Sequence, residues 1–352
     1  MKVLTKYYKK IILVLIIPYL IFSFLLFARI PFAVYSPGGI SEVEDLIDID
    51  YNNDKIIEGS ISTTYIMAIQ RPTYFQFILG TLSPYASIST LSTTYETYTN
   101  KEIAQISYLD KETSVDASII IAYTYAKKVN PEIEINYVVK SLVYGKAEYL
   151  DHYDEINFGD EFVKLVGDDG YEVTDISEIS DFTKNLSSYD FTFKNEDGET
   201  YTVSLSKNPE YNKFGVTLKE YAIVDDSTIY PTYTEKQSNI GGPSGGLLQT
   251  LAIYNHLIDE DLTHGLKIAG TGTIRYDGSV GYIGGVEQKV ITAYVNKVDL
   301  FFMPSLDSAY THDNYQVALK VCEKYGINPD GWLIPVSSFS DAIAYLEGLD
   351  ES

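Results

Sequence analysis

One serine lies among glycines at the expected start of a helix. Residues 241–246 read Gly-Gly-Pro-Ser-Gly-Gly, with Ser244 in fourth place, and an apolar helical run follows over residues 247–257. Glycines leave the backbone free on both sides of the serine. The start of a helix also leaves N–H groups unpaired, and these can stabilise a developing oxyanion. The pattern therefore indicates a nucleophile, and the local sequence leaves open that Ser244 only caps the helix.

A nucleophilic serine needs a base, and the best candidate is Lys289. In the helix predicted over residues 285–297, Val286, Val290 and Ala293 form an apolar stripe at helical spacing. Lys289 falls on or beside that stripe. A lysine turned toward a core loses solvation, so its pKa falls and the neutral amine can accept a proton. The alternative is a lysine whose stem covers apolar surface while its amine reaches water.

The histidines are weaker candidates for the base. His256 lies twelve residues after Ser244 on the same predicted helix, roughly 18 Å away at 1.5 Å per residue. His152, His264 and His312 have no positioned acid in a recognisable arrangement. The four histidines also lack metal-ligand spacing. We therefore expect no metal site and no cofactor.

Two other features of the sequence are set aside. Ser204 and Lys207 fit the Ser-x-x-Lys pattern of penicillin-binding proteins, which places the pair at a helix start. Residues 201–205 instead read as a strand, and the companion Ser-Asp-Asn and Lys-Thr-Gly triplets are absent. The single cysteine, Cys322, cannot form an intramolecular disulfide and is expected to be buried in a helix.

Residues 240–304 resemble the proteolytic domain of the Lon family. That family carries its serine in a Gly-Pro-Ser-Ala/Gly-Gly motif, followed by Thr-Gly-x-Ile, Ile-Gly-Gly-hydrophobic-x-x-Lys and a strand that ends in proline. The corresponding segments here are residues 242–246, Thr271–Ile274, Ile283–Lys289 and Leu300–Pro304. The resemblance implies that Ser244 is the nucleophile, Lys289 its general base and Thr271 a supporting partner of the lysine. Gly241 stands where the ATP-dependent members carry an acid, as in a smaller, membrane-anchored branch.

The resemblance implies an ATP-independent serine endopeptidase that uses a Ser-Lys dyad. No Gly-x4-Gly-Lys-Ser/Thr loop for ATP occurs in the sequence, so substrates are expected to be small or extended secreted peptides, or exported proteins. Two alternatives remain open: a non-catalytic adaptor that contains a PDZ domain, and an amidase or esterase that uses the same two residues. An oligomer is compatible with the resemblance, because the larger relatives form rings.

The order of predicted elements from about residue 240 onward indicates an α/β layer arrangement. The resemblance implies an α/β Lon-type protease domain over residues 211–352, and residues 36–132 are expected to pack with it. A small β-rich domain over residues 133–210 resembles a PDZ domain through the strand entry at Ile156–Asp160. The glycine loop that holds a ligand carboxylate in that family is not evident here. The main predicted helices are residues 112–128, 247–257, 285–297, 314–325 and 340–348, and the main strands are 58–70, 266–274, 298–303 and 332–336.

The start of the chain predicts a membrane anchor. Residues 1–10 hold four lysines and are expected to form a cytoplasmic tail, and residues 11–29 are expected to form a single transmembrane signal anchor. This predicts a single-pass protein of the cell membrane whose catalytic domain and residues 36–132 lie outside the cytoplasm. The net charge of −23 argues against nucleic acid as a partner, because phosphates would be repelled.

Overall fold

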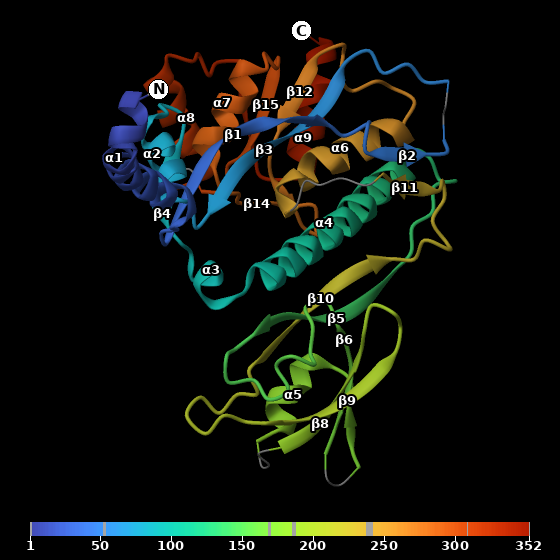
Figure 1. Cartoon of the computed structure of the whole chain (residues 1–352). Coiled ribbons are helices and arrows are strands. Elements are labelled where there is room, and N and C mark those ends of the chain that lie inside the picture. The colour runs from blue at the N-terminus through green and yellow to red at the C-terminus, as the bar shows by residue number, and fades with distance from the viewer. Residues whose placement is uncertain are drawn as a thin grey trace.

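The computed structural model describes residues 2–51, 54–167, 170–184, 188–236, 242–307 and 309–351. Gly241, the first glycine of the serine motif, lies outside these ranges. The fold of the described residues is mixed α/β, with two six-stranded sheets. In Figure 1 the long helix α4 (Asn100–Val129) lies between the two sheets.

The first sheet joins strands from both ends of the chain. Its strands, in order across the sheet, are β16 (Leu333–Val336), β15 (Leu300–Pro304), β12 (Lys267–Gly270), β3 (Ser60–Gln70), β1 (Phe32–Glu42) and β4 (Ser87–Thr90). Strand β12 runs parallel to both β3 and β15, and it places Gly270 beside Thr63. Strand β1 runs antiparallel to β3 and β4. Residues far apart in the sequence thus share one sheet beside the candidate site.

Helices cover both faces of this sheet. They are α4, α6 (Gly246–Leu257) and α9 (Phe339–Glu347) on one face, and α7 (Val286–Val295) and α8 (Asn314–Tyr325) on the other. Successive side chains of a strand point to opposite faces. Ile268 and Phe302 accordingly pack with α4, α6 and α9, whereas Ala269 and Phe301 pack with α7 and α8. The sheet is therefore the middle layer of three.

Local signals fix where two of these helices begin. The hydroxyl of Thr99 accepts from the backbone N–H of Glu102, and the Glu102 side chain accepts from the backbone N–H of Thr99, so a capping box starts α4. Ser338 and Asp341 form the same reciprocal pair at the start of α9. The capping box of α4 fixes the residue at which this helix begins, and so which of its residues face the candidate site.

The second sheet has a core of its own and lies at the bottom of Figure 1. It contains β5 (Tyr137–Lys146), β6 (Glu161–Val166), β7 (Glu172–Val173), β8 (Ser188–Lys194), β9 (Thr200–Ser206) and β10 (Val216–Val224). Its core includes Phe191 and Phe193, which are almost fully buried, and helix α5 (Ile176–Phe182) packs beside it. Strand β10 lies beyond the predicted range 133–210 and forms one edge of the sheet.

Most of the expected elements are confirmed, with one informative difference. The strand predicted over residues 58–70 is β3, and the helix predicted over residues 285–297 is α7. The strand predicted over residues 266–274 is interrupted: β12 ends at Gly270, and a short strand β13 (Thr273–Ile274) pairs with β14 (Val280–Gly281). Other short elements are β2 (Ile47–Ile49), which pairs with β11 (Tyr233–Glu235), α2 (Tyr74–Leu82), α3 (Thr93–Thr97) and the 3-10 turn η2 (Gly348–Glu351).

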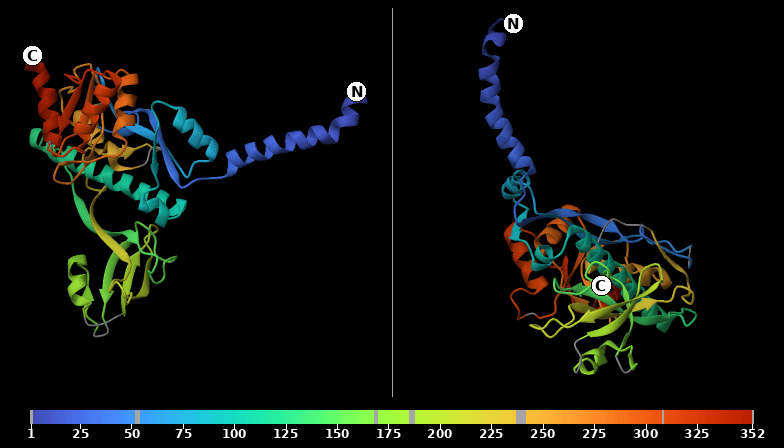
Figure 2. Two further views of the ribbon diagram at one scale, coloured as in Figure 1. Left: turned by 90° about the vertical axis from the view of Figure 1, so that its left-hand side faces the viewer. Right: turned by 60° about the horizontal axis from the view of Figure 1, so that its bottom comes forward.

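The prediction of a transmembrane helix at residues 11–29 was wrong. Helix α1 (Lys2–Phe27) projects from the body in Figure 2, yet none of the helices in the described ranges has both the length and the apolar character needed to cross a bilayer. The prediction considered this apolar segment without a packing partner in the rest of the chain. Its last turns instead contact α2, where the rings of Phe22 and Phe75 lie 6.4 Å apart and those of Phe24 and Tyr74 lie 5.1 Å apart.

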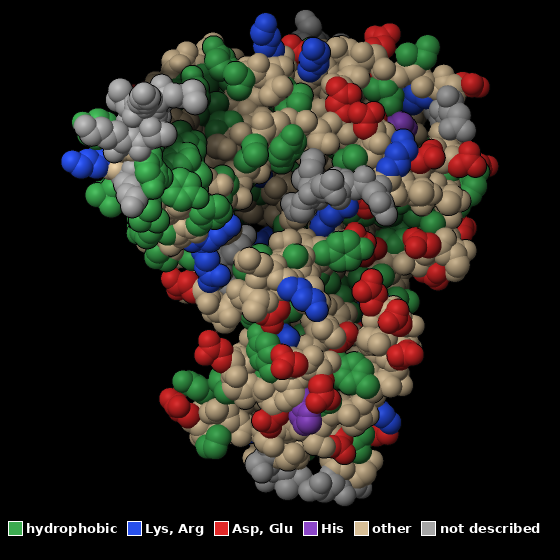
Figure 3. All heavy atoms as spheres, viewed as in Figure 1, with side chains coloured by type: hydrophobic (Ala, Val, Ile, Leu, Met, Phe, Trp, Pro, Cys, Tyr) green, Lys and Arg blue, Asp and Glu red, His purple; other side chains and the backbone are tan. Residues whose placement is uncertain are grey.

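The surface has an uneven distribution of side-chain types. Figure 3 shows hydrophobic side chains gathered at the upper left, over α1 and α2, and acidic side chains spread over the right side and the lower sheet. The exposed apolar residues of α2 include Phe75, Ile78, Leu79 and Leu82.

Candidate active site

Ser244 lies in a single turn of 3-10 helix, η1 (Pro243–Gly245), directly before α6. Gly242, which precedes the turn, has φ of 87°, a left-handed conformation that favours glycine. The N-cap of α6 is Gly245, and it makes no side-chain capping bond. Ser244 therefore does not cap α6, which removes the alternative that the local sequence left open.

Hydrogen bonds from the interrupted strand fix the turn that carries Ser244. The Ser244 carbonyl accepts from the Gly272 N–H at 2.8 Å and from the Thr271 hydroxyl at 3.0 Å. The Leu247 N–H in turn donates to the Gly272 carbonyl at 3.0 Å. A Cβ at residue 272 would meet Val280 Cγ1 at 2.9 Å, so only glycine fits this approach. The interruption between β12 and β13 is thus what joins Thr271 and Gly272 to the serine turn.

Helix α4 supports the same turn from the other side. The Ser114 hydroxyl donates to the Pro243 carbonyl at 3.3 Å, and the Ser118 hydroxyl donates to the Gly246 carbonyl at 3.0 Å. Both serines are buried. We did not identify them from the sequence, because their partners are about 130 residues away and no local pattern connects them. The sequence feature that could have indicated these two serines is the presence of small polar residues in a predicted helix of mostly apolar residues.

Lys289 is buried, and its amine faces the serine. Its side chain is 2% exposed, and Nζ lies 2.8 Å from Ser244 Oγ and 2.8 Å from Thr271 Oγ1. Burial lowers the pKa of Lys289 to about 7, because desolvation disfavours the charged form. The alternative of a surface lysine with its amine in water is therefore excluded. The structure brings together Ser244, Lys289 and Thr271.

Glycine also fixes the start of the helix that carries Lys289. Gly285, the N-cap of α7, has φ of 68°, and a Cβ there would meet Ile66 Cδ1 at 2.7 Å. The Lys289 N–H donates to the Gly285 carbonyl at 3.0 Å. Lys289 thus lies on the first full turn of a helix that begins tightly against β3, and this contact holds the amine near the serine turn.

Ser244 and Lys289 line an open cleft of about 950 Å³. The lining includes residues of β3, among them Thr63 and Ile66, and the ion pair between Lys111 and Glu235 at 3.0 Å. A Cβ at Gly245 would meet the Thr63 side chain at 3.1 Å, so β3 lies directly beside the serine turn. The cleft is large enough for several residues of an extended peptide.

The other candidate residues lie elsewhere. No histidine lines the described part of the cleft. His256 is inside α6, and burial lowers its pKa. His264 contacts the Leu346 carbonyl, and His312 lies 5.5 Å from the Tyr310 ring. Over the described ranges, no group of three His, Cys, Asp or Glu residues is arranged to hold a metal ion.

The Ser-x-x-Lys pair and the cysteine are also separate from the cleft. Ser204 lies on β9 and bonds to Asp190, whereas the Lys207 amine bonds to the Thr183 carbonyl. Cys322 is buried in α8, as expected. These residues contribute to packing and to local hydrogen bonding.

Comparison with known proteins gives a partial similarity. No family model matches the chain. A Lon protease of Malacoplasma penetrans is 34% identical over 101 residues, which are 29% of this chain and 12% of that protein. A Lon protease of Ureaplasma parvum serovar 3 is 40% identical over 72 residues, 20% of this chain and 9% of that protein. Part of the chain is therefore Lon-like, and the matches extend over about a tenth of these relatives.

Proposed function

We propose that this protein is an ATP-independent serine endopeptidase in which Ser244 is the nucleophile and Lys289 the general base. The observation that carries the proposal is the 2.8 Å contact between the Lys289 amine and the Ser244 hydroxyl, with the amine buried. The similarity to Lon proteases supports a protease-like activity. A serine becomes nucleophilic when an adjacent neutral base can remove its proton.

The reaction proceeds in two halves. Neutral Lys289 takes the hydroxyl proton while Ser244 Oγ attacks the peptide carbonyl, and backbone N–H groups of the η1 turn stabilise the oxyanion. The resulting lysine ammonium then gives its proton to the leaving amine, and an acyl-enzyme remains on Ser244. Water, deprotonated by the same lysine, hydrolyses the acyl-enzyme and restores the serine.

Thr271 positions the two reacting groups. Its hydroxyl accepts from the Lys289 amine and donates to the Ser244 carbonyl, at 2.8 Å and 3.0 Å. One hydroxyl thus connects the base to the backbone of the nucleophile. We assign Thr271 the role of orienting the amine lone pair toward Ser244 Oγ.

The cleft fits small or extended polypeptides better than folded proteins. The serine turn lines it, and the sequence holds no P-loop through which ATP hydrolysis would unfold a substrate. We therefore propose loosely folded or extended polypeptides, such as secreted peptides, as the substrate class. The location outside the cytoplasm and the PDZ-like binding role stay predictions, and cell fractionation tests the first of them.

Cleavage of casein, an unfolded polypeptide, tests the proposal. We expect the purified full chain to cleave casein without ATP, and we expect Ser244→Ala and Lys289→Ala to lose nearly all of this activity. Full cleavage by either variant would exclude the dyad. A wild-type chain that cleaves an ester but no peptide would point to an esterase, and one that cleaves neither would favour the non-catalytic adaptor.

A further inference from the structure

A second hollow of about 440 Å³ adjoins the catalytic turn. It is lined by Pro243, next to Ser244, and it shares Ser114 with the cleft. One wall is a face of α4 that includes Asp110, and another is the segment Lys219–Tyr221 of β10. The hollow therefore lies where the second sheet meets the helix that supports the serine turn. Its volume is within the range of ordinary ligand sites.

The β10 side of this hollow is a strand edge. Strand β10 is the terminal strand of its sheet, and among the strands of the described ranges it pairs with β5 alone. The Val224 N–H bonds instead to Asp116, so this residue faces away from β5. The register is regular from Leu218 to Val224, and residues of an antiparallel strand alternate in direction. The backbone of Glu220 therefore also faces away from β5.

The N–H and C=O of Glu220 form an open pairing position. Glu220 lines the hollow, and no hydrogen bond from its N–H or C=O outside the sheet is found in the described part of the chain. An extended peptide binds such an edge by adding a strand, with backbone hydrogen bonds that tolerate many side chains. The rest of the lining carries both signs of charge: Asp110 and Glu220 are acidic, and Lys219 and Arg275 are basic. A lining with both charges favours binding of a peptide through its backbone over selection of peptides whose side chains carry one sign of charge.

We propose that the second hollow binds an extended segment of the polypeptide substrate, which pairs with β10 at Glu220 while another segment occupies the catalytic cleft. This inference rests on the proposed function and extends it to a second binding position. The occupant is the substrate chain because the hollow reaches the serine turn at Pro243 and Ser114. Long, unfolded chains consequently bind more tightly than segments that fill the cleft alone.

Binding of fluorescein-labelled casein tests this inference without any cleavage. The Ser244→Ala chain serves as the reference, and fluorescence anisotropy gives the Kd. Glu220→Pro removes the outward-facing N–H, a position at which an edge strand tolerates proline. We expect the Kd for casein to rise about three- to tenfold, the effect of one lost hydrogen bond.

The matched control lies on the opposite edge of the same sheet. The Ser206 N–H on β9 bonds to Asp151, so the Thr202 N–H, four residues earlier, also faces outward. Thr202→Pro should leave the Kd within twofold. Because a proline can disturb a strand, Asp110→Trp provides a second variant, which fills the hollow from α4 and should weaken casein binding as Glu220→Pro does.

The outcomes separate this inference from the proposed function. Equal Kd values for Glu220→Pro and Thr202→Pro, or casein binding unaffected by Asp110→Trp, would overturn the second binding position. Undiminished casein cleavage by Ser244→Ala would overturn the dyad and would leave the binding result to stand by itself.

Discussion

The buried amine of Lys289 is the feature on which the site depends at the scale of single residues. Among the described residues its polar contacts are the hydroxyls of Ser244 and Thr271, and no ion pair to a carboxylate is found there. A carboxylate would favour the charged form and raise the pKa. Burial beside neutral hydroxyls instead lowers the pKa of Lys289 to about 7, so the amine is partly neutral at neutral pH. This is the property that a general base requires.

The lowered pKa predicts the dependence of activity on pH. Only the neutral amine can accept a proton, so kcat/KM for a peptide should rise about tenfold per pH unit below 7 and level off above it. Lys289→Arg, which stays charged, should be inactive throughout. A pH profile of peptide cleavage measures this. A profile that falls as pH rises through 7 would show that the charged amine is the active form.

The same pKa shift has a consequence for stability. The pKa of Lys289 is about 7 in the folded chain and about 10.4 in the unfolded chain. Between these two pH values the unfolded chain binds more protons at Lys289, so the free energy of unfolding rises with pH and the destabilisation caused by burying this amine becomes smaller. We expect Lys289→Met to gain stability relative to wild type below pH 7, and this advantage to decrease toward pH 10. Urea unfolding of both chains across this range measures it. A difference in the free energy of unfolding between the two chains that stays constant with pH would contradict the lowered pKa of Lys289.

Thr271 provides a second test at this scale. Thr271→Val keeps the shape but removes the hydroxyl that joins Lys289 to the Ser244 backbone. We expect kcat to fall about tenfold to a hundredfold, the effect of losing a hydrogen bond to a chargeable group, with the fold retained. Thr271→Ser, which keeps the hydroxyl, should recover most of the activity. Equal losses in both variants would point to packing and would contradict the positioning role.

At the scale of elements, the sequence predicted the pieces of the site better than their arrangement. The glycine-rich motif located Ser244, and the apolar stripe of α7 placed Lys289 toward the core. The strand predicted over residues 266–274 did not show the interruption at Gly272, because its cause is a hydrogen bond to Ser244, 28 residues away. Ser114 was missed for the same reason: its partner Pro243 lies on a distant segment. Local patterns record periodicity but not such contacts.

The start of α7 can be tested with a matched pair of glycines. Gly285→Ala forces a side chain into a left-handed conformation and against Ile66, so we expect a loss of about 1–2 kcal/mol in the free energy of unfolding and reduced cleavage. Gly284→Ala, where nothing lies within 4 Å of the new Cβ, should change little. Urea denaturation and a peptidase assay measure both effects. Similar stabilities of the two variants would contradict the fixed start of α7.

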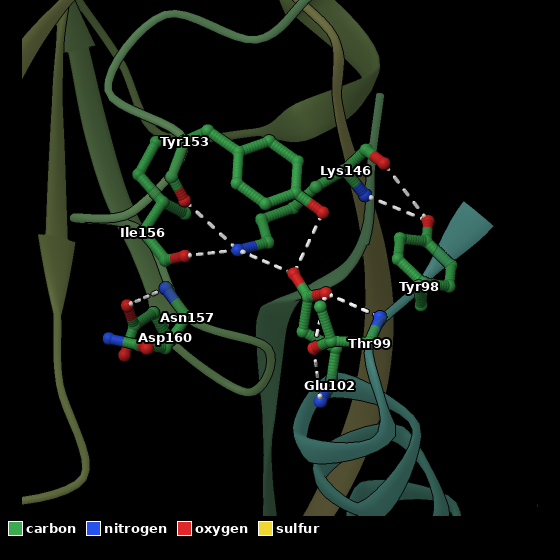
Figure 4. Close-up of polar contacts among 8 residues, drawn as sticks. All are labelled: Tyr98, Thr99, Glu102, Lys146, Tyr153, Ile156, Asn157 and Asp160. Carbon is green, nitrogen blue, oxygen red and sulfur yellow. Dashed lines mark hydrogen bonds and ion pairs between the residues drawn. The ribbon is translucent and has the colours of Figure 1, made fainter. Parts of the chain in front are cut away.

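At the scale of the whole molecule, a buried polar network joins the second sheet to α4 (Figure 4). The Lys146 amine on β5 lies 3.5 Å from the Glu102 carboxylate on α4, and it donates to the carbonyls of Tyr153 and Ile156. Burial would raise the pKa of Glu102, but hydrogen bonds from Thr99 and Tyr153, together with the Lys146 charge, hold it below its usual range. The network therefore attaches the second sheet, which includes β10, to α4, the helix that supports the serine turn.

Removing one partner of this network should be costly. Lys146→Met leaves the Glu102 carboxylate buried without its cation, and we expect a loss of about 3–5 kcal/mol in the free energy of unfolding. Lys164→Met, which removes a cation from an exposed pair with Glu172, should cost less than about 1 kcal/mol. Urea unfolding of both variants gives the comparison. Equal losses would show that the Lys146–Glu102 pair contributes no more to the free energy of unfolding than an exposed ion pair does.

The largest error of the sequence interpretation also belongs to this scale. The apolar run at the start of the chain predicted a transmembrane helix, and the contacts of Phe22 and Phe24 with α2 were not visible in that pattern. We expected residues 36–132 to pack with residues 211–352, but the sequence did not indicate that β3 pairs with β12, because about 200 residues separate the two strands. Apolar character and periodicity describe one segment at a time, whereas these features depend on which segments meet.

The most direct test of the Ser244–Lys289 dyad is the rate at which a fluorophosphonate labels the protein, followed by intact mass and peptide mapping. The dyad predicts a single adduct on Ser244 in the wild-type chain, and labelling of Lys289→Met at pH 8 that is slower by about a hundredfold or more, because general-base assistance contributes about that much. Labelling of Lys289→Met at the wild-type rate, or an adduct on any residue other than Ser244, would contradict it.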